Sequence, residues 1–393
     1  MKTLHNTLIA IGFFTTLIAI SFLTIAMPDK KVSDIENRFL EQFPTFSEET
    51  IINGEFTKKF ESYYSDQIFL RNIFIEAYTR LQLLLNKTVI SNTVVLDNDW
   101  ILSEPFAKVY TDYMDKSTGN LNTLANQFPK TEFYFAAAPH KTNMLMDKFP
   151  NYLPENVGVE AQQYFWSNLH KNVIPIDLHN YFLNHYSYDE RENMYFRTDH
   201  HWNMDGAFAG YTGIMEALAT QSNSIVNAPS TIDQYTKTCL TNNYFVGSYN
   251  RQLYLLIDAS KEVLCHYEPN SSFNFSSVYA KDGRGKEFTN FEDIYKTDTE
   301  GQVTYAGLYA GDFSVIKYNK EKADNDKKVV IVKDSYANAI TPFIAQHFTK
   351  TTVLDLRHYT EKTLKDFLEE EQADIVLFIY NNSNLFGNMF QFE

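Results

Sequence analysis

The sequence predicts an α/β fold with a mostly parallel sheet, an antiparallel insertion and an N-terminal membrane anchor. Three observations predict it. Before and after a central region, short apolar runs alternate with amphipathic segments, which is the pattern of β-α-β units with parallel strands. The central region, about residues 230–326, has short aromatic alternations and Asn or Gly turns without a helical period. The first 28 residues contain a long apolar run.

The apolar run, residues 8–26, has no charged residue and is long enough to cross a bilayer, which needs roughly 20 residues. Residues 24–26 also fit a small-x-small cleavage site, so residues 1–28 can be an uncleaved anchor or a signal peptide. The length of the run favours the anchor. We therefore expect a single-pass membrane protein with its body outside the cytoplasm, and secretion after cleavage is the alternative.

A polar linker, residues 29–50, separates this segment from the predicted extracytoplasmic body, residues 51–393. Within residues 54–85, apolar side chains recur at spacings of three and four with one break near Asp66, which predicts two amphipathic helices. Residues 93–102 alternate on both sides of an Asn-Asp turn, as in a β-hairpin.

Five apolar stretches predict the strands of the main sheet: residues 132–138, 172–178, 329–332, 351–356 and 373–382. Helix-like segments lie between them, at about residues 121–128, 160–170, 204–218 and 336–348. Sites in parallel sheets form where strands end and helices begin. Three loops meet that rule: residues 139–141, 334–336 and 380–382.

The charge balance limits the kinds of partner that the protein can bind, and the cysteine content limits the disulfides it can form. Against 34 Lys and Arg stand 49 Asp and Glu, a net charge of -15, with no basic cluster that could follow a phosphate backbone. Nucleic acid is therefore not an expected partner. The two cysteines, Cys239 and Cys265, are too few for a disulfide framework and lack metal-ligand spacing. One disulfide and two unpaired buried thiols are both compatible with the sequence.

Ser335 is the candidate nucleophile. It follows an apolar strand and precedes a helix-like segment, so its hydroxyl would lie at a helix N-terminus. The backbone N–H groups and the dipole at that position can stabilise a developing oxyanion. In the plainer alternative, Asp334 or Ser335 simply caps the helix.

A serine nucleophile needs a base, and the base needs an orienting acceptor. Asp199 and His201, two positions apart in "TDHHW", can supply both from a single turn. Alternatively, Thr198 or Asp199 caps the following helix while His200 and Trp202 pack. Adjacent histidines diverge in a regular backbone and no second ligand cluster is evident, so we predict no metal site.

The "TDHHW" stretch resembles the signature of the DHHW protein family, which is related to alginate O-acetyltransferases of the SGNH-hydrolase-like type. Nearly the whole chain fits this resemblance, and "TDHHW" and "KDSYAN" are its most specific parts. The other matching stretches are "ENRFLEQFPTFS" from residue 36, "FESYYSDQIFLRN" at 60–72, "AAPHK" ending at 141, "GSYNR" from 247 and "VVIVKDSYANA" from 329.

The resemblance implies an SGNH-hydrolase-like three-layer sandwich in which Asp199 orients, His201 is the base and Ser335 is the nucleophile. In these enzymes the Asp-x-His pair precedes the serine. This chain departs from the ordinary SGNH pattern, because residues 333–334 are Lys-Asp where Gly-Asp would stand and no clear Gly-x-Asn-Asp block occurs. The second oxyanion-hole donor is therefore open.

Other residues are candidates for oxyanion or substrate contacts. For the oxyanion hole they are the backbone N–H of Ser335 or Tyr336 and the side chain of Asn381 or Asn382. For the acyl or sugar group they are Arg357, Lys141 and, by stacking, Trp202. His140 fits a structural loop residue better than a second base. Ordinary surface or capping polarity is an equal alternative for each of these residues.

The resemblance implies an extracytoplasmic O-acyltransferase, and most simply an O-acetyltransferase, that modifies a cell-envelope or secreted polysaccharide through an acyl-serine. No cofactor is expected. Because acetyl-CoA is absent outside the cytoplasm, a membrane-bound O-acyltransferase would have to supply the acyl donor. Two alternatives are a carbohydrate esterase with the same three residues and a non-catalytic protein of envelope assembly or glycan binding.

Overall fold

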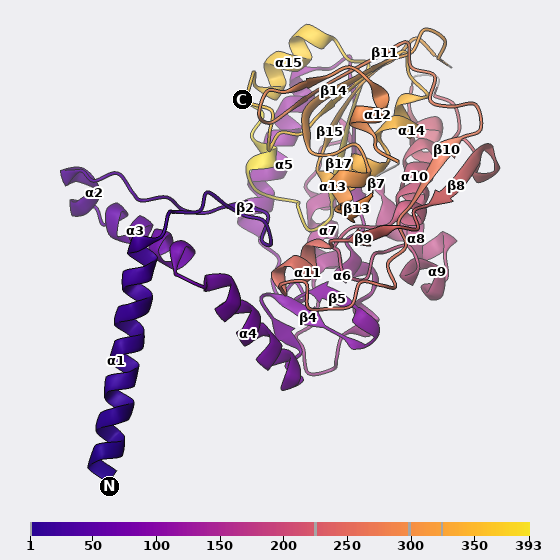
Figure 1. Ribbon diagram of the computed structural model, residues 1–393. Helices are drawn as coiled ribbons and strands as arrows, with labels where there is room; N and C mark the ends of the chain where they lie inside the picture. Colours follow the sequence, from indigo (N-terminus) through magenta and orange to yellow (C-terminus); the bar gives the residue numbers. More distant parts are fainter. Residues whose placement is uncertain (1, 224–225, 298–299, 324) are drawn as a thin grey trace. The chain divides into compact units, whose positions relative to one another are not determined.

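The computed structural model describes residues 2–223, 226–297, 300–323 and 325–393 (Figure 1). The chain forms two compact units. The N-terminal unit comprises Met1–Ser91 and Asn250–Ile257, and the large unit comprises Asn92–Tyr249 and Asp258–Glu393.

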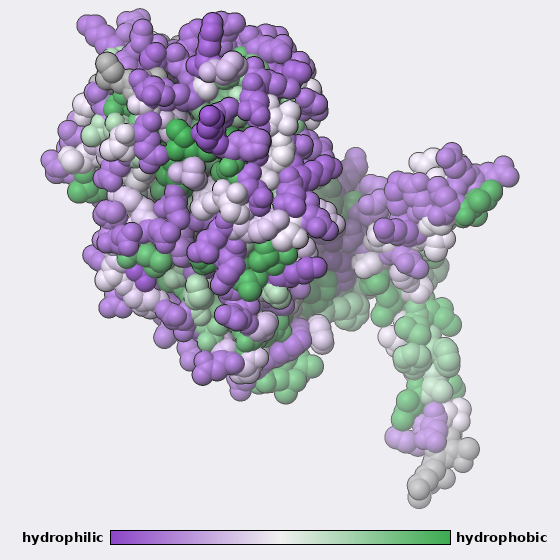
Figure 2. Space-filling model, turned by 180° about the vertical axis from the view of Figure 1, so that it is seen from behind, coloured by the Kyte–Doolittle hydropathy of each residue, from purple (hydrophilic) through white to green (hydrophobic). Residues whose placement is uncertain are grey.

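The N-terminal unit begins with helix α1 (Lys2–Ala26). Its segment Leu4–Ala26 is long and apolar enough to cross a membrane. The side of α1 seen in Figure 2 carries mainly hydrophobic residues, and Ile18 and Phe22 are each 68% exposed. The helix is therefore not a buried core helix, and it is compatible with an anchor or a signal sequence.

The rest of the N-terminal unit contains a strand pair, three helices, the short strand β3 (Val89–Ile90) and residues 250–257. Strands β1 (Val32–Ser33) and β2 (Arg38–Phe39) pair antiparallel. The two predicted amphipathic helices are α3 (Glu55–Gln67) and α4 (Arg71–Leu84), preceded by the short α2 (Glu48–Ile52). Arg38 donates two hydrogen bonds to the carboxylate of Asp66, at 2.8 and 2.6 Å, and so joins β2 to α3.

An eight-stranded sheet forms the centre of the large unit. Five neighbouring strands are parallel and correspond to the five predicted strands: β16 (Lys350–Leu354), β15 (Lys328–Lys333), β17 (Ile375–Asn381), β6 (Glu132–Ala138) and β7 (Val173–Asp177). Three antiparallel strands continue the sheet beyond β16: β14 (Phe313–Asn319), β11 (Ser277–Asp282) and β12 (Glu287–Phe288).

The sheet is therefore mixed, and the prediction of a mostly parallel sheet is corrected. Strand β14 lies within the predicted insertion and pairs with β16, with Val315 opposite Leu354. The insertion thus covers the open edge of β16, whose backbone groups would otherwise lack partners.

Helices pack on both faces of the sheet, because alternate side chains of a strand point to opposite faces. Apolar side chains of one face form a core with α8 (Leu178–His185), α10 (Met204–Gln221) and α14 (Thr341–Ala345). Those of the other face form a second core with α5 (Thr111–Gln127), α7 (Gly158–Ser167) and α15 (Leu364–Glu371). The sheet is the middle of three layers.

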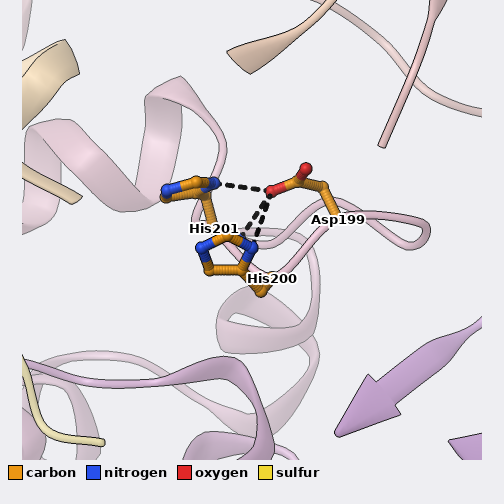
Figure 3. Close-up of side chains that lie close together, drawn as sticks. All are labelled: Asp199, His200 and His201. Atoms are coloured by element: carbon orange, nitrogen blue, oxygen red, sulfur yellow. Dashed lines mark hydrogen bonds and ion pairs between the residues drawn. The ribbon is translucent and has the colours of Figure 1, made fainter. Parts of the chain in front are cut away.

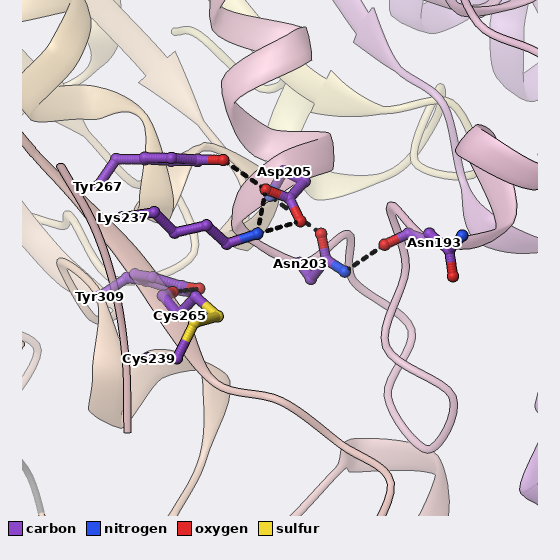
Figure 4. Close-up of a disulfide and its surroundings, with 8 residues drawn as sticks. All are labelled: Asn193, Asn203, Asp205, Lys237, Cys239, Cys265, Tyr267 and Tyr309. Atoms are coloured by element: carbon purple, nitrogen blue, oxygen red, sulfur yellow. Dashed lines mark hydrogen bonds and ion pairs between the residues drawn. A yellow bond between two sulfur atoms is a disulfide. The ribbon is translucent and has the colours of Figure 1, made fainter. Parts of the chain in front are cut away.

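The remainder of the insertion contains two strand pairs. Strands β8 (Tyr235–Cys239) and β10 (Cys265–Pro269) pair antiparallel, whereas β9 (Asn243–Phe245) and β13 (Gly301–Val303) pair parallel. The insertion is therefore not purely antiparallel. A disulfide joins Cys239 to Cys265 across β8 and β10. Figure 4 shows this ribbon beside the start of α10, where Lys237 and Tyr267 both donate to Asp205.

Short elements complete the large unit. The predicted hairpin is β4 (Thr93–Val95) with β5 (Ile101–Ser103), and Asn98 and Asp99 turn with positive φ. The predicted helix at 336–348 is instead a 3-10 segment, Ser335–Ala339, followed by α14. Other short elements are α6 (Lys141–Met144), α9 (Tyr188–Glu192), α12 (Phe291–Ile294), α13 (Tyr305–Leu308) and the 3-10 segments Asp97–Asp99, Met146–Lys148, Ile232–Gln234 and Asn388–Phe390. Helix α11 (Ser248–Gln252) includes residues of both units.

Candidate active site

Loops at the carboxyl ends of three neighbouring strands carry most of the predicted site residues. Strand β6 leads into His140 and Lys141, β15 into Ser335, and β17 into residues 381–382. These strands are adjacent in the order β15-β17-β6, so their carboxyl ends lie at one edge of the sheet. The "TDHHW" loop, residues 198–202, comes just before α10.

Capping does not account for the key residues. Asn203 is the N-cap of α10, and its side chain accepts from the backbone N–H groups of the first turn. Asp334 caps the turn after β15 in the same way. Asp199 is therefore not the cap of α10, and the capping alternative is wrong for this residue. Because Asp334 caps the turn after β15, the hydroxyl of Ser335 remains free for another partner.

Asp199, His201 and Ser335 form a continuous hydrogen-bonded chain. Figure 3 shows the hydrogen bond between His201 and Asp199. The Nδ1 atom of His201 lies 2.6 Å from Oδ1 of Asp199, and its Nε2 atom lies 2.8 Å from Oγ of Ser335. A carboxylate on Nδ1 favours the tautomer with the proton on that nitrogen, so Nε2 can accept the proton of the serine. The histidine and the serine are 134 positions apart in the sequence.

Asp199 is held from two further directions. Its Oδ1 also accepts from the backbone N–H of His201 at 2.9 Å, and its Oδ2 accepts from the backbone N–H of Ser248 at 2.6 Å. Burial raises the pKa of the Asp199 carboxyl, but the charges of His201 and His200 and these hydrogen bonds lower it further, so the net pKa lies below its usual value. The carboxylate is therefore ionised at neutral pH.

His200 is a neutral neighbour of His201. Burial and the charge of His201 lower the pKa of His200 to about 3, against the opposing charge of Asp199. Its Nδ1 atom lies 2.6 Å from Oγ of Ser248. The imidazole therefore does not compete with His201 for the carboxylate as a second cation.

Two aromatic side chains pack around His201 and Tyr336. The ring of Tyr305 stacks on the imidazole of His201 with centroids 3.8 Å apart. Trp202 is fully buried, and its indole N–H donates to the backbone carbonyl of Tyr336 at 3.0 Å. A Cβ atom at Gly210 would lie 2.7 Å from the Trp202 ring, so this ring needs a glycine on α10. The expectation that Trp202 stacks on a sugar is wrong, because its ring is core.

The turn after β15 offers one free backbone donor. The N–H of Tyr336 donates to Oδ1 of Asp334 at 2.9 Å and is not available to an oxyanion. Among the residues that the structure describes, no group accepts from the N–H of Ser335. Of the two backbone candidates, Ser335 fits an oxyanion hole and Tyr336 does not.

The two asparagines at the end of β17, Asn381 and Asn382, differ in whether the side chain keeps a free hydrogen-bond donor. Asn382 is buried and fully paired: its Oδ1 accepts from the backbone N–H of His140, and its Nδ2 donates to Gln162. Asn381 uses Oδ1 to accept from Ser383, while its Nδ2 has no acceptor within the described part of the chain. Asn382 is therefore structural, and Asn381 keeps a side-chain donor.

Lys141 is completely buried, and its ammonium group donates to three backbone carbonyls, those of Phe196, Arg197 and Asp199. Because all three N–H groups are used, the expected substrate contact of Lys141 is wrong. Burial lowers the pKa of Lys141 to about 7, against the charges of Glu262 and Asp199, which raise it. His140 is likewise buried, as expected of a structural loop residue.

Arg357 follows β16 and stands level with Ser335 in the strand register. Strands β15 and β16 pair Val332 with Leu354, so Ser335 and Arg357 each stand three residues beyond this pair. Asp355 holds the guanidinium by two hydrogen bonds, of 2.9 and 2.6 Å. The side chain is 35% exposed and retains N–H groups that a substrate can use.

Asp199, His200 and His201 also lie close enough together to hold a metal ion, with their ligand atoms within 4.8 Å of one another. Both ring nitrogens of His201 already face Asp199 and Ser335, and Nδ1 of His200 faces Ser248. A metal ion would have to break these contacts, so the geometry fits a hydrogen-bonded relay better than a metal centre.

Sequence reasoning missed three residues of the site: Ser248, Glu262 and Tyr305. Ser248 lies in the "GSYNR" stretch, whose resemblance to the family could have pointed to it. No local pattern marks Glu262 or Tyr305, because both act through contacts with residues far away in the sequence.

Comparison with known proteins shows which family and which solved structures the chain resembles. The DHHW protein family matches residues 114–354. The solved structure of PatB1 from Bacillus cereus is 40% identical, covers 77% of this chain and 100% of its own, and superimposes with a TM-score of 0.71. A structure of the same protein with a sulfonyl adduct is 37% identical, covers 76% and 99% of the two chains, and has a TM-score of 0.68.

A DHHW family protein from Eubacterium siraeum DSM 15702 is 20% identical, covers 77% of this chain and 94% of its own, and has a TM-score of 0.58, which shows a shared fold. No curated protein matches the chain. On the family match and the likeness to PatB1, the chain belongs to the DHHW protein family.

Proposed function

We propose that this protein is an extracytoplasmic, SGNH-hydrolase-like O-acyltransferase, and most simply an O-acetyltransferase, that acts on polysaccharide hydroxyl groups. Ser335 is the nucleophile, His201 the general base and Asp199 the residue that orients the base. The observation that carries the proposal is the position of His201, with Nδ1 2.6 Å from a carboxylate and Nε2 2.8 Å from a serine hydroxyl.

In the first half-reaction, Oγ of Ser335 forms a bond to the acyl carbon while Nε2 of His201 takes the hydroxyl proton. The tetrahedral oxyanion collapses, the bond to the leaving group breaks, and His201 returns the proton to that group. In the second half, a sugar hydroxyl attacks the acyl-serine and gives its proton to His201. Collapse transfers the acyl group to the sugar, and Ser335 recovers its proton.

The oxyanion hole consists of the backbone N–H of Ser335 and the side-chain N–H of Asn381. Both lack an acceptor among the described residues, and both lie at carboxyl ends of neighbouring strands. Arg357, fixed by Asp355 beside the nucleophile, contacts the acyl donor or the acceptor. These donors take the place of the Gly-x-Asn-Asp block that the sequence lacks.

The sulfonyl adduct on Bacillus cereus PatB1 supports a nucleophile in this fold. A sulfonyl adduct forms when a nucleophile displaces the leaving group of a sulfonyl reagent, and activated serine hydroxyls react in this way. At 37% identity and almost complete coverage of that chain, this likeness supports the same chemistry at Ser335.

Helix α1 supports the proposed location. Residues 1–28 anchor the chain, or act as a signal peptide, and residues 51–393 lie outside the cytoplasm after the linker 29–50. A membrane-bound O-acyltransferase supplies the acyl donor there, and a polysaccharide of the envelope is the acceptor. A carbohydrate esterase with the same residues differs only in using water as the acceptor.

The test is mass spectrometry of the full-length protein in detergent after exposure to p-nitrophenyl acetate. We expect one added acetyl group on the peptide that contains Ser335. The label should be absent in Ser335→Ala and strongly reduced in His201→Ala, and an exposed serine variant, Ser276→Ala, should label as the wild type does. Labelling that persists in Ser335→Ala would overturn the proposal.

Transfer and hydrolysis share the acyl-serine, so a second measurement separates them. Isolated acyl-enzyme is divided between water and an added oligosaccharide, and the acetylated sugar is compared with free acetate. A transferase gives acetylated sugar, whereas an esterase gives acetate whatever the sugar concentration. If the polysaccharide role persists in Ser335→Ala, the protein acts without catalysis.

A further inference from the structure

The loop that carries Asp199 has no regular secondary structure, yet two charged side chains form hydrogen bonds with its backbone groups. Lys141 donates to the carbonyls of Phe196 and Arg197, at 2.9 and 3.0 Å, and to that of Asp199. Glu262 accepts from backbone N–H groups of the same loop.

The contacts of Glu262 are as specific as those of Lys141. Its Oε1 accepts from the backbone N–H and from the hydroxyl of Thr198, both at 2.6 Å, and its Oε2 accepts from the N–H of Arg197 at 3.2 Å. Hydrogen bonds to charged groups are roughly twice as strong as those between neutral groups. The loop is therefore fixed by the donor groups of Lys141 and by the acceptor groups of Glu262.

Each of these side chains comes from a different part of the fold. Lys141 begins α6 directly after β6, and Glu262 belongs to the insertion. The ammonium group of Lys141 also lies 5.0 Å from the centre of the Tyr249 ring and 5.6 Å from that of Trp100. Such ring faces favour a cation in a site without water.

We infer that Lys141 and Glu262 are a pair of positioning residues, which fix the backbone of residues 196–199 so that the Asp199 carboxylate meets His201. This inference rests on the proposed function. The carbonyl of Asp199 is held by Lys141, while its carboxylate is held by Ser248 and His201, so both ends of the residue are fixed before any substrate binds.

The two charges depend on each other. Burial raises the pKa of Glu262, although Thr198, Arg197 and the charge of Lys141 lower it, whereas burial lowers the pKa of Lys141 and the charge of Glu262 raises it. Removing either charge therefore weakens the charged form of the other. The effects of the two substitutions should overlap rather than add.

The chain offers a matched control. Lys148 lies 4.8 Å from the centre of the same Trp100 ring and pairs with Glu192 at 2.9 Å, but none of its hydrogen bonds involves residues 196–199. Lys148→Met and Glu192→Gln therefore remove a neighbouring ion pair without touching the loop. The test variants are Lys141→Met, Glu262→Gln and the double variant.

Two readouts are compared on full-length protein in detergent. One is the rate of Ser335 acetylation, and the other is the far-downfield proton NMR signal of the hydrogen bond between His201 and Asp199, assigned by its absence in Asp199→Asn. We expect each test variant to be folded by circular dichroism, to lose or weaken that signal, and to label about 100-fold more slowly, as when a catalytic group shifts by an ångström. The double variant should be no slower than the slower single variant.

The control variants should keep the signal and the wild-type rate. A folded Glu262→Gln protein with an unchanged signal and rate would overturn the inference, and this milder variant decides the matter if Lys141→Met does not fold. Failure of the proposed function is seen separately, as labelling that does not depend on Ser335 in an otherwise wild-type chain.

Discussion

Tyr305 lies face to face on His201, with ring centroids 3.8 Å apart and ring planes 3° from parallel. Tyr305 belongs to α13, in the insertion, and its hydroxyl donates to the backbone carbonyl of Tyr336 at 3.3 Å. The insertion thus contacts both His201 and Tyr336, the residue after Ser335. A ring face stabilises an imidazolium by a cation–π contact, which exists only after His201 has taken the proton.

Tyr305→Leu should therefore slow acetylation of Ser335 by about tenfold, since a desolvated cation–π contact is worth on the order of 1 to 2 kcal/mol. Tyr305→Phe keeps the ring and should stay within about threefold of wild type, because it loses only one long hydrogen bond. Stopped-flow rates of acetylation check both. Equal rates in the two variants would remove the stacking argument.

The predictability of this fold differs between its parts for physical reasons. The five parallel strands are apolar runs because both faces are covered, and such runs are visible in the sequence. The strand ends then brought Ser335 and Asn381 to one edge of the sheet. By contrast, the sequence places the residues of β14 in a separate insertion. Only the pairing of β14 with β16 in the structure shows that this strand extends the main sheet.

Lys141 shows a second limit. A lysine just after a strand looks like a free cation at a sheet edge, and only its tertiary contacts reveal three backbone carbonyls around it. Tyr305 and Glu262 are equally invisible in the sequence, because their partners lie in another part of the chain. Motifs therefore pointed to the three residues that the structure joins by hydrogen bonds, Asp199, His201 and Ser335, whereas the residues that hold them required the fold.

The lowered pKa of Asp199 predicts how stability depends on pH. The folded state keeps this carboxylate ionised below the ordinary aspartate value of 3.8, so the unfolded chain takes up the proton first as the pH falls. The stabilisation is complete above that value and is lost as the pH falls through the folded-state pKa.

Below about pH 4, the wild type should consequently lose thermal stability more steeply than Asp199→Asn, which has no such group. Thermal unfolding followed by circular dichroism between pH 3 and pH 7 measures this, with both proteins compared at each pH. At pH 7 the same variant should label Ser335 about 100-fold to 10,000-fold more slowly. Parallel stability curves would contradict the ionised, hydrogen-bonded carboxylate.

Gly247 should tolerate no side chain, because a Cβ atom there would lie 2.3 Å from the carbonyl oxygen of Thr198. Gly247→Ala must therefore separate the backbone of residue 247 from that of Thr198. The neighbouring N–H of Ser248, which donates to the carboxylate of Asp199, is displaced by the same movement. We expect a loss of stability of about 1 to 3 kcal/mol and slower acetylation of Ser335. Urea unfolding and the acetylation rate check it.

Gly119→Ala is the control, because Gly119 lies in α5 with no atom within 4 Å of the added Cβ. That substitution should be neutral, or stabilising by about 0.5 to 1 kcal/mol, since alanine is the better helix former. Should Gly247→Ala behave like Gly119→Ala, the close approach to Thr198 would not exist in solution.

The disulfide between Cys239 and Cys265 should matter for stability more than for chemistry. It closes a loop with a sequence separation of 26, which predicts a loss of about 3 kcal/mol in the variant Cys239→Ser/Cys265→Ser. The ribbon stays attached to α10 through Lys237 and Asp205, so the acetylation rate should change little. Thermal unfolding with and without reductant measures the loss, and the unreduced wild type should take up no iodoacetamide when unfolded.

Asn381→Asp isolates the second oxyanion donor. The aspartate keeps the oxygen that accepts from the N–H and hydroxyl of Ser383, but it has no amide N–H to give to an oxyanion. Loss of one such donor costs about 100-fold to 1,000-fold in turnover, and the added negative charge repels the oxyanion further. The donor acts on the tetrahedral state, so acetylation should slow at saturating p-nitrophenyl acetate, whereas the apparent affinity for the ester should hardly change.

The exposed variant Asn388→Asp adds the same charge elsewhere and should react as the wild type does. A wild-type rate in Asn381→Asp would remove Asn381 from the oxyanion hole and leave the N–H of Ser335 as the surviving candidate among those considered.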